Sequence, residues 1–221
     1  MRLVVLAVLA ATLAVPAAAS AEPIVNVKLA RAAVRYESPH TVTGTLTDGT
    51  TELAGQEVVL EGRRYPYEGS YRVIERATTG PDGSFKFKVE LDRNHRLRVS
   101  APAQLVSSKY AQAYTLPGFE LSFRAVSPGV VRLYQRYTVP KRVRLSSPTL
   151  FYLGPRKAKR AVLRKTGELK RVRAGRYTSS VDVRLPASWG GTFKFASCFR
   201  ASTGSGMGDP KQSCPVLHYK F

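Results

Sequence analysis

Basic side chains crowd the stretch 156–176, in which ten Lys and Arg residues accompany a single acid, Glu168. Guanidinium and ammonium groups at this density attract polyanions, and binding releases the counterions that a polyanion carries. The alternative is that these residues are ordinary solvated positions of an Arg-rich sequence. The predicted polyanion-binding residues are Arg156, Lys157, Lys159, Arg160, Arg164, Lys165, Lys170, Arg171, Arg173 and Arg176.

A Thr-Gly pair at 166–167 separates two strand-like segments, 161–165 and 169–173. The pair is typical of a turn, so the two segments are expected to form a β-hairpin. Such a hairpin places the basic pair 164–165 near the basic pair 170–171 across the ladder. Like charges facing each other repel unless an anion lies between them. The pattern therefore predicts an anion-binding ribbon.

The positive charge is concentrated in the C-terminal half of the chain. Residues 22–120 carry 13 Lys and Arg against 12 Asp and Glu, whereas residues 121–221 carry 21 against 3. A field this one-sided favours an anionic partner, and acidic envelope polymers, anionic surfaces and extracellular nucleic acid all satisfy the electrostatics. Because no nucleic-acid recognition motif accompanies the charge, no specific nucleic-acid partner is predicted. We expect an anionic cell-envelope polymer or surface.

The first 21 residues have the pattern of a signal peptide. Arg2 is followed by an almost unbroken apolar stretch over 3–15, and small residues occupy 19–21. Cleavage is expected before Glu22. The alternative is an uncleaved anchor, but the apolar stretch is shorter than the roughly 20 residues of a spanning helix. The mature protein is therefore predicted to be secreted and extracellular, with its charge retaining it at the cell surface, and to have no transmembrane segment.

Two cysteines in an exported chain predict one disulfide, between Cys198 and Cys214. The 15 residues between them are rich in glycine. Closing a loop of this length stabilises the fold by roughly 3 kcal/mol in the chain-entropy model. The alternative functions of Cys198 are those of a thiolate nucleophile or a metal ligand.

Alternation of apolar and polar residues predicts an all-β protein. Within 85–91, for example, apolar side chains occupy every second position, which places them on one face of a strand. The same pattern recurs over 96–99, 142–145, 181–185 and 193–195, separated by turn-like sequences. Short antiparallel strands at this spacing favour β-sandwiches. The turn-like pairs are Asp48-Gly49, Ala54-Gly55, Asp82-Gly83, Thr166-Gly167 and Gly190-Gly191.

Two sandwiches in tandem are expected after the leader. The Leu-Pro-Gly sequence at 116–118 interrupts the strand pattern, and the charge balance changes just beyond it. The predicted division is a signal peptide at 1–21, a nearly neutral sandwich at 22–117 and a basic sandwich at 118–221 that contains the disulfide. We expect the nearly neutral part to have little affinity for polyanions.

The N-terminal half resembles bacterial immunoglobulin-like domains of exported and cell-surface proteins. The residues that carry the resemblance are the motifs at 42–46, 53–58 and 78–85, followed by Asn94 and the segment 97–99. The resemblance implies a sandwich of about seven strands in which the Ala-Gly and Asp-Gly pairs form turns. Carboxypeptidase regulatory-like and transthyretin-like sandwiches share these motifs and are the alternative folds.

The C-terminal half resembles a β module that ends some secreted bacterial proteins of unassigned role. The resemblance rests on Cys198-Phe199, on the Gly-Met-Gly-Asp-Pro sequence at 206–210 and on Cys214-Pro215. It implies a fold only.

The sequence from Ser197 to Arg200 resembles the catalytic motif of L,D-transpeptidases, which have a Cys two residues before an Arg. That family also has a Gly directly before the Cys and a His-Gly upstream, and here Ser197 replaces the Gly and no His lies between His95 and Cys198. We therefore expect no catalytic residue. His40, His95 and His218 are dispersed and acids are few in the basic half, so neither a metal site nor a cofactor is predicted.

Aromatic residues accompany the basic charge. As exposed residues they would stack on sugars or bases, but at strand spacing such side chains more often pack in a core. The Tyr-Pro-Tyr sequence at 65–67, flanked by Arg63, Arg64 and Glu68, is expected at a loop or sheet edge, packed over the end of the sandwich. The alternative is that these tyrosines are exposed and bind a partner or a sugar. A purely structural spacer or protein-interaction module is the third functional alternative. The aromatic residues are Tyr134, Tyr137, Phe151, Tyr152 and Tyr177.

Overall fold

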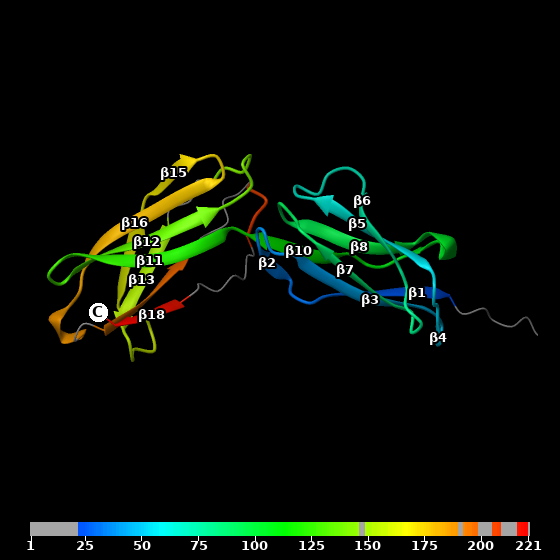
Figure 1. The fold of residues 1–221 in the computed structure, drawn as a ribbon, viewed down its shortest axis with the longest axis horizontal. Helices are drawn as coiled ribbons and strands as arrows, with labels where there is room; N and C mark the ends of the chain where they lie inside the picture. The colour runs from blue at the N-terminus through cyan, green and yellow to red at the C-terminus, as the bar shows by residue number, and fades with distance from the viewer. Residues whose placement is uncertain (1–21, 146–148, 190–191, 199–204, 209–215, 221) are drawn as a thin grey trace, which may run out of the picture.

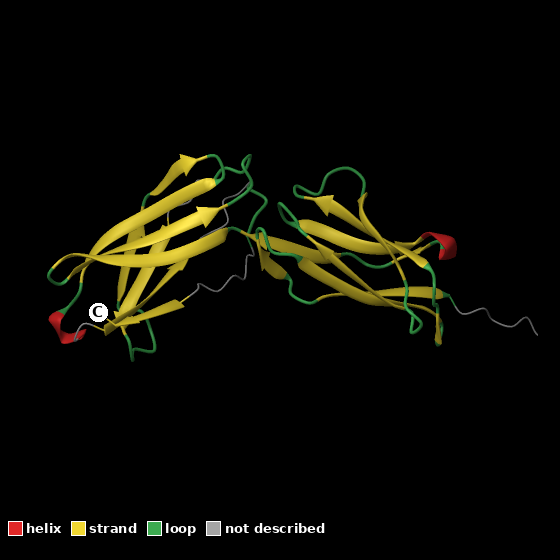
Figure 2. Cartoon of the chain, in the orientation of Figure 1, coloured by secondary structure: helices red, strands yellow, loops and turns green. Residues whose placement is uncertain are grey.

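The fold is entirely β. The computed structural model describes residues 22–145, 149–189, 192–198, 205–208 and 216–220. Strands dominate these residues, and the only helical turns among them are two 3₁₀ turns, η1 (Pro102–Gln104) and η2 (Ala187–Trp189) (Figure 2). The predicted all-β sandwich class is confirmed. The predicted signal peptide and its cleavage site lie outside the described residues, and within these residues no helix is long and apolar enough to cross a membrane.

Two sheets face each other between residues 23 and 116 and form what we call the N-terminal sandwich (Figure 1). Each strand pair in it is antiparallel except β2 with β10. The strands of the first sheet are β1 (Pro23–Leu29), β3 (His40–Asp48), β4 (Thr51–Glu52) and β7 (Ser84–Val89). The strands of the second sheet are β2 (Ala33–Arg35), β5 (Glu57–Arg64), β6 (Arg72–Thr78), β8 (His95–Ala101), β9 (Val106–Ser107) and β10 (Ala111–Leu116).

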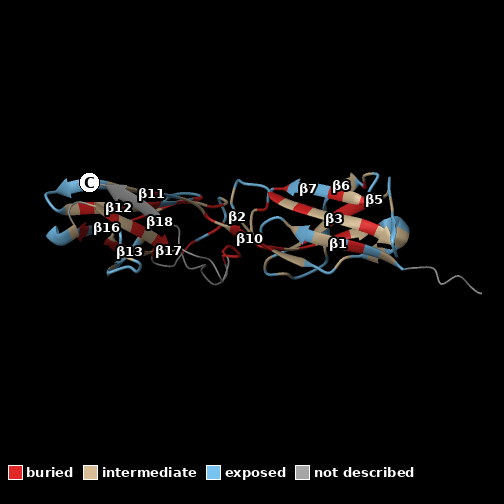
Figure 3. Cartoon of the chain, turned by 90° about the horizontal axis from the view of Figure 1, so that it is seen from below, coloured by how far each residue is buried: buried red, intermediate tan, exposed pale blue. Residues whose placement is uncertain are grey.

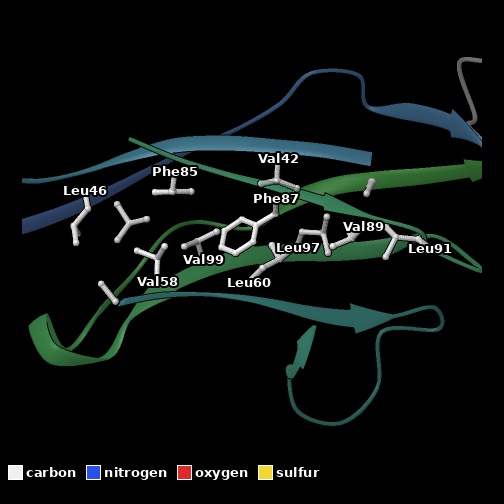
Figure 4. Packing of buried hydrophobic residues seen from close by; sticks show 13 residues of the cluster. Val42, Leu46, Val58, Leu60, Phe85, Phe87, Val89, Leu91, Leu97 and Val99 are labelled. Atoms are coloured by element: carbon white, nitrogen blue, oxygen red, sulfur yellow. The ribbon is translucent and has the colours of Figure 1, made fainter. Parts of the chain in front are cut away.

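The core of the N-terminal sandwich follows the predicted alternation. In β7 the side chains of Phe85, Phe87 and Val89 are buried while the lysines between them are exposed. Figure 4 shows Phe87 among buried residues of both sheets, including Leu60 and Leu97. The burial of alternate apolar residues is what holds the two sheets together.

The predicted Asp-Gly turn before β7 is confirmed. Gly83 has a φ of 65°, a conformation that L-residues rarely adopt. A Cβ at this position would lie 2.5 Å from the carbonyl oxygen of Leu46. The predicted turn at 190–191 lies outside the described residues.

A second pair of antiparallel sheets, between residues 118 and 220, forms the C-terminal sandwich. Figure 3 shows buried and less buried positions alternating along β12. The strands of its first sheet are, in spatial order, β11 (Gly118–Ser127), β12 (Val130–Thr138), β16 (Arg176–Arg184) and β15 (Leu169–Arg173). The strands of its second sheet are β14 (Leu163–Gly167), β13 (Thr149–Pro155), β17 (Thr192–Cys198) and β18 (Val216–Lys220).

Buried polar side chains connect the two sheets of the C-terminal sandwich. The Tyr137 hydroxyl from β12 lies 3.1 Å from the Thr149 hydroxyl of β13. The Ser197 hydroxyl of β17 donates a hydrogen bond to the side-chain carbonyl of Gln135 on β12. Burial raises the pKa of Tyr137, so this hydroxyl stays protonated as a hydrogen-bonding group. The pairs satisfy polar groups that would otherwise be costly to bury.

The strand expected over 142–145 is absent. Val143 and Leu145 are buried as the alternation predicts, but they lie in a loop. The reason is the Tyr177 hydroxyl, which donates to the carbonyl oxygen of Val143 at 3.1 Å and accepts from the amide of Leu145 at 3.3 Å. The backbone groups that a strand would pair with a neighbour are instead satisfied by one side chain.

The predicted division at 117/118 falls between β10 and β11, which are separated by Pro117 alone. A third cluster of buried residues fills the junction, and it combines Tyr137, Tyr177 and Met207 with partly buried Tyr36 from the N-terminal sandwich. The Arg35 guanidinium also lies 4.1 Å from the centre of the Phe119 ring. That each sandwich is an independent folding unit stays a prediction.

The segment 205–208, which we call the clasp, bonds to the N-terminal sandwich. The Asn94 amide donates to the carbonyl oxygen of Gly206 at 2.7 Å, and the Gly208 amide donates to that of Thr115 at 2.9 Å. The Asn94 side chain donates to the Gly208 carbonyl at 3.0 Å. Since Met207 is buried at the junction, the clasp joins both sandwiches.

His40 is buried at the start of β3, where its ring contacts no hydrogen-bonding partner among the described residues. Burial and the nearby positive charge of His95 lower the pKa of His40 to about 4. The unfolded chain binds a proton at this position near pH 6.5. Between these two values the unfolded state carries more protons than the folded state.

We predict that the free energy of unfolding falls as the pH drops from 6.5 to 4, with His40 contributing about 3 kcal/mol of the loss. His40→Leu should reduce the slope in this window, because leucine carries no titrating group. Denaturant unfolding at several pH values measures both slopes. Equal slopes for the wild type and the variant would contradict the assignment.

Candidate anion-binding edge

The predicted hairpin of β14 and β15 is wrong. Strand β14 pairs with β13 in one sheet, and β15 pairs with β16 in the other. The chain passes from the sheet of β14 to the sheet of β15 at Glu168, the one residue between the two strands. Arg164 and Arg171 therefore belong to different sheets and do not face each other across a ladder.

Close packing requires glycine at position 167, where the chain changes sheets. Gly167 is buried, and a Cβ on it would lie 2.5 Å from the Ser179 hydroxyl and 2.7 Å from the Phe151 ring. Its φ is not positive, so the residue is required for close approach and not for a turn. Strands that switch sheets in this way make the corners of sandwiches.

Both β14 and β15 lie at the edges of their sheets. Because only one residue separates the two strands, the two edges lie on the same side of the sandwich. All ten predicted binding residues are exposed along this side. We call them the basic edge. The loop that precedes β14 carries Arg156, Lys157, Lys159 and Arg160. Strands β14 and β15 carry Arg164, Lys165, Lys170, Arg171 and Arg173, and Arg176 is the first residue of β16.

The charges of the basic edge are almost uncompensated. Lys170 lies 3.6 Å from Glu168, and both side chains are largely exposed. No other member of the basic edge forms an ion pair with a described acid. Arg173 and Arg176 occupy directly opposite positions of the β15–β16 ladder. Because like charges opposite each other are destabilising, this end of the basic edge favours an anion.

Length distinguishes the basic edge from a compact anion pocket. The eleven consecutive residues from 163 to 173 extend over at most about 35 Å at the rise of a β-strand. Exposed charges interact over only about 8 Å at physiological salt. A small anion therefore experiences two or three of these side chains, whereas a polymer lying along the edge contacts more of them.

Sequence reasoning counted Lys141 in the charge of the C-terminal half but placed neither Lys141 nor Glu37 at the basic edge. Lys141 lies against Gly175, the turn residue between β15 and β16, and its exposed side chain adds charge to this end of the basic edge. A depression of about 590 Å³ lies nearby and is lined by Arg173, Arg176 and, from the N-terminal sandwich, Glu37. Only the folded junction brings Glu37 close to the edge.

The aromatic residues divide between core and surface. Tyr137, Phe151 and Tyr177 are buried, as their strand spacing indicates. Tyr134 and Tyr152 are only half-buried. The Arg164 guanidinium lies 5.9 Å from the centre of the Tyr152 ring, so one member of the basic edge has an aromatic neighbour.

No catalytic or metal-binding constellation appears in the part of the chain that the structure describes. It contains no group of three metal-ligating side chains. His40 and His95 come close together, but both are buried, and burial lowers the pKa of each imidazole. No free cysteine is present among the described residues. Cys214 lies outside them, so its predicted bond to Cys198 stays a prediction.

Comparison with known proteins adds no relative. No protein-family model matches the chain, and no curated protein matches it. Function must therefore be inferred from the chemistry of the molecule.

Replacing Gly167 by alanine should destabilise the protein. The added Cβ must displace either a core ring or a buried hydroxyl, and overpacking of this kind typically costs about 1–3 kcal/mol. Chemical denaturation measures the loss. Gly129→Ala is a control for the substitution itself, because a Cβ there meets no atom within 4 Å, although its φ of 71° adds local strain. A neutral effect of Gly167→Ala would contradict the close-packed corner.

Proposed function

We propose that the mature protein is an exported, non-enzymatic binding module that associates with anionic polymers or surfaces of the cell envelope through the basic edge. The observation that carries the proposal is a row of exposed basic side chains with one acidic partner among the described residues. Counterion release and short-range attraction supply affinity without requiring a particular chemical structure in the polymer.

The N-terminal sandwich presents the basic edge in this proposal. Its motifs resemble immunoglobulin-like domains, which commonly serve as spacers or interaction modules in exported proteins. A signal peptide at 1–21 supports an extracellular location. The junction at Tyr36 and Met207 supports a fixed arrangement of the two sandwiches.

The two alternative functions make different predictions. A wall-modifying enzyme with Cys198 as its nucleophile requires a thiol that alkylating reagents modify before reduction. A purely structural spacer requires that the basic edge bind nothing. An intact mass lower by two hydrogens than that of the reduced protein, together with salt-sensitive binding, would exclude both.

We predict that replacing three members of the basic edge, Lys165, Arg171 and Arg173, by glutamine weakens binding to a long polyphosphate. Each basic residue near an anionic surface contributes about 1 kcal/mol, so the expected loss is about 100-fold. The variant should also show a flatter dependence of the dissociation constant on salt, since fewer counterions are released. Titrations at several salt concentrations measure both quantities.

A control variant removes equal charge elsewhere. Lys28, Lys86 and Lys88 are exposed on the other sandwich, and their replacement by glutamine changes the net charge by the same amount. It should alter affinity only slightly, because exposed charges act over about 8 Å. Equal losses in the two variants would show that net charge binds the polymer and that the basic edge has no special role.

A further inference from the structure

A cluster of arginines and tyrosines covers the outer face of the β5–β8–β10 sheet, far in sequence from the basic edge. The antiparallel register places Arg63 of β5 directly opposite Arg96 of β8. Because Leu97 and Val99 point into the core, Arg96 and Arg98 point outward. The arginine–tyrosine cluster consists of Arg63, Arg96, Arg98, Tyr67, Tyr71 and Tyr110.

Each arginine of the cluster lies over a tyrosine ring. The Arg96 guanidinium is 4.5 Å from the ring centre of Tyr67 and 4.8 Å from that of Tyr110. The Tyr71 ring receives two guanidinium groups, from Arg63 at 4.4 Å and from Arg98 at 4.2 Å. Stacking holds the guanidinium planes in place while leaving their N–H edges free to donate hydrogen bonds.

Two of these arginines have no anionic partner. The Arg98 Nε donates to a Glu61 carboxylate oxygen at 2.8 Å. By contrast, neither Arg63 nor Arg96 forms an ion pair with any acid that the structure describes. The Nε atoms of both are buried without a hydrogen-bond partner. The cluster therefore carries two uncompensated positive charges.

This arrangement works against folding. Like charges directly opposite each other on a sheet are destabilising, and so is a buried donor without an acceptor. Apolar side chains at positions 63 and 96 would avoid both costs. Local conflicts of this kind are expected where a protein binds a ligand, and two adjacent guanidinium groups suit a carboxylate or phosphate oxygen.

The tyrosines indicate which kind of anion fits. Tyr71 lies against two guanidinium groups, and the half-buried Tyr67 hydroxyl accepts a hydrogen bond from Gln112 at 2.7 Å. Tyr110 is 54% exposed and offers the one open ring of the cluster. Single-stranded nucleic acids are bound by several rings that stack successive bases. One ring beside an arginine pair fits a sugar next to an acidic group instead.

We propose that the arginine–tyrosine cluster is a binding site for an acidic glycan. A carboxylate of the glycan lies between Arg63 and Arg96, and an adjoining sugar ring packs on Tyr110. The site is independent of the basic edge, so it does not rest on the proposed function. It revises the expectation that the nearly neutral half binds anions weakly, because Glu61 is the one described acid that pairs with an arginine of the cluster.

The test uses the full mature chain with Lys165, Arg171 and Arg173 changed to glutamine, so that the basic edge contributes little. The probe is an oligogalacturonate, and its methyl ester is the uncharged control ligand. We expect the acid to bind at least tenfold more tightly than the ester. Further replacement of Arg63 and Arg96 by glutamine should weaken binding of the acid about 100-fold, because two charge-assisted hydrogen-bonding groups are lost.

The matched control replaces Arg64 and Arg76 by glutamine. These arginines lie in the same sheet and pair with Asp92 and Glu57, respectively. It removes the same charge and should change affinity less than twofold. If the glutamine pair at 63 and 96 prevents folding, lysine at both positions keeps the charge but loses the planar stack, and it should still weaken binding by tenfold.

Three results would overturn the proposal. The first is equal affinity of the cluster variant and the control variant. The second is no binding of oligogalacturonate at millimolar concentration. The third is an oligothymidylate that binds the cluster as tightly as the acid, which would assign the site to nucleic acid. Tyr110→Ala should weaken binding severalfold and Tyr110→Phe should not, since the ring is retained.

Discussion

Gly167 allows the chain to leave one sheet and enter the other within a single residue, and the basic edge exists because of this corner. Neither Ser179 nor Phe151 leaves room for a Cβ there. Strands β14 and β15 consequently become the edges of two facing sheets, with no strand of the described residues outside them. Exposed lysine and arginine are tolerated at such edges, where they also discourage pairing with other chains. The corner thus places the basic residues of one continuous segment along one side of the sandwich.

The junction between the sandwiches determines which residue of the N-terminal sandwich lies at the end of the basic edge. The clasp bonds to Asn94 and Thr115, and its Met207 is buried against Tyr137 and Tyr177. With Pro117 as the sole residue between β10 and β11, little chain is available for independent movement. Burial of apolar surface at the junction and these hydrogen bonds place Glu37 beside the last arginines of the edge.

Local patterns predicted much of the fold. Alternation located β7, β8, β16 and β17, because a strand with one buried face imposes a period of two on its sequence. Alternation also identified Val143 and Leu145 as buried but wrongly assigned them to a strand. The Tyr177 hydroxyl takes the place of strand-to-strand hydrogen bonds there, and the alternation in the sequence is the same in both cases. The Thr-Gly pair at 166–167 failed as a turn signal because glycine serves close packing as well as positive φ.

The candidate sites were harder to predict than the fold. The ten basic residues were found by composition, but their arrangement along the edges of two sheets and not in a hairpin depends on strand pairing between distant segments. The arginine–tyrosine cluster was predicted only in part, because the sequence offered the tyrosines at 65–67 as a contact for a partner or a sugar but did not bring Arg96, Arg98 and Tyr110 beside them. Its arginines come from two strands and its tyrosines from loops, and the balanced charge of residues 22–120 hides a local excess. The further signal that could have completed it was the position of Arg96 and Arg98 on one strand face.

The central claim is that the basic edge binds a polymer along its length. Affinity for linear polyphosphates of increasing size tests it most directly, with Arg63 and Arg96 changed to glutamine to exclude the second site. The dissociation constant should decrease with length until the chain spans about 35 Å, the extent of eleven residues in a strand, and then level off. An affinity already maximal for tripolyphosphate would contradict the account, because it would indicate a compact pocket.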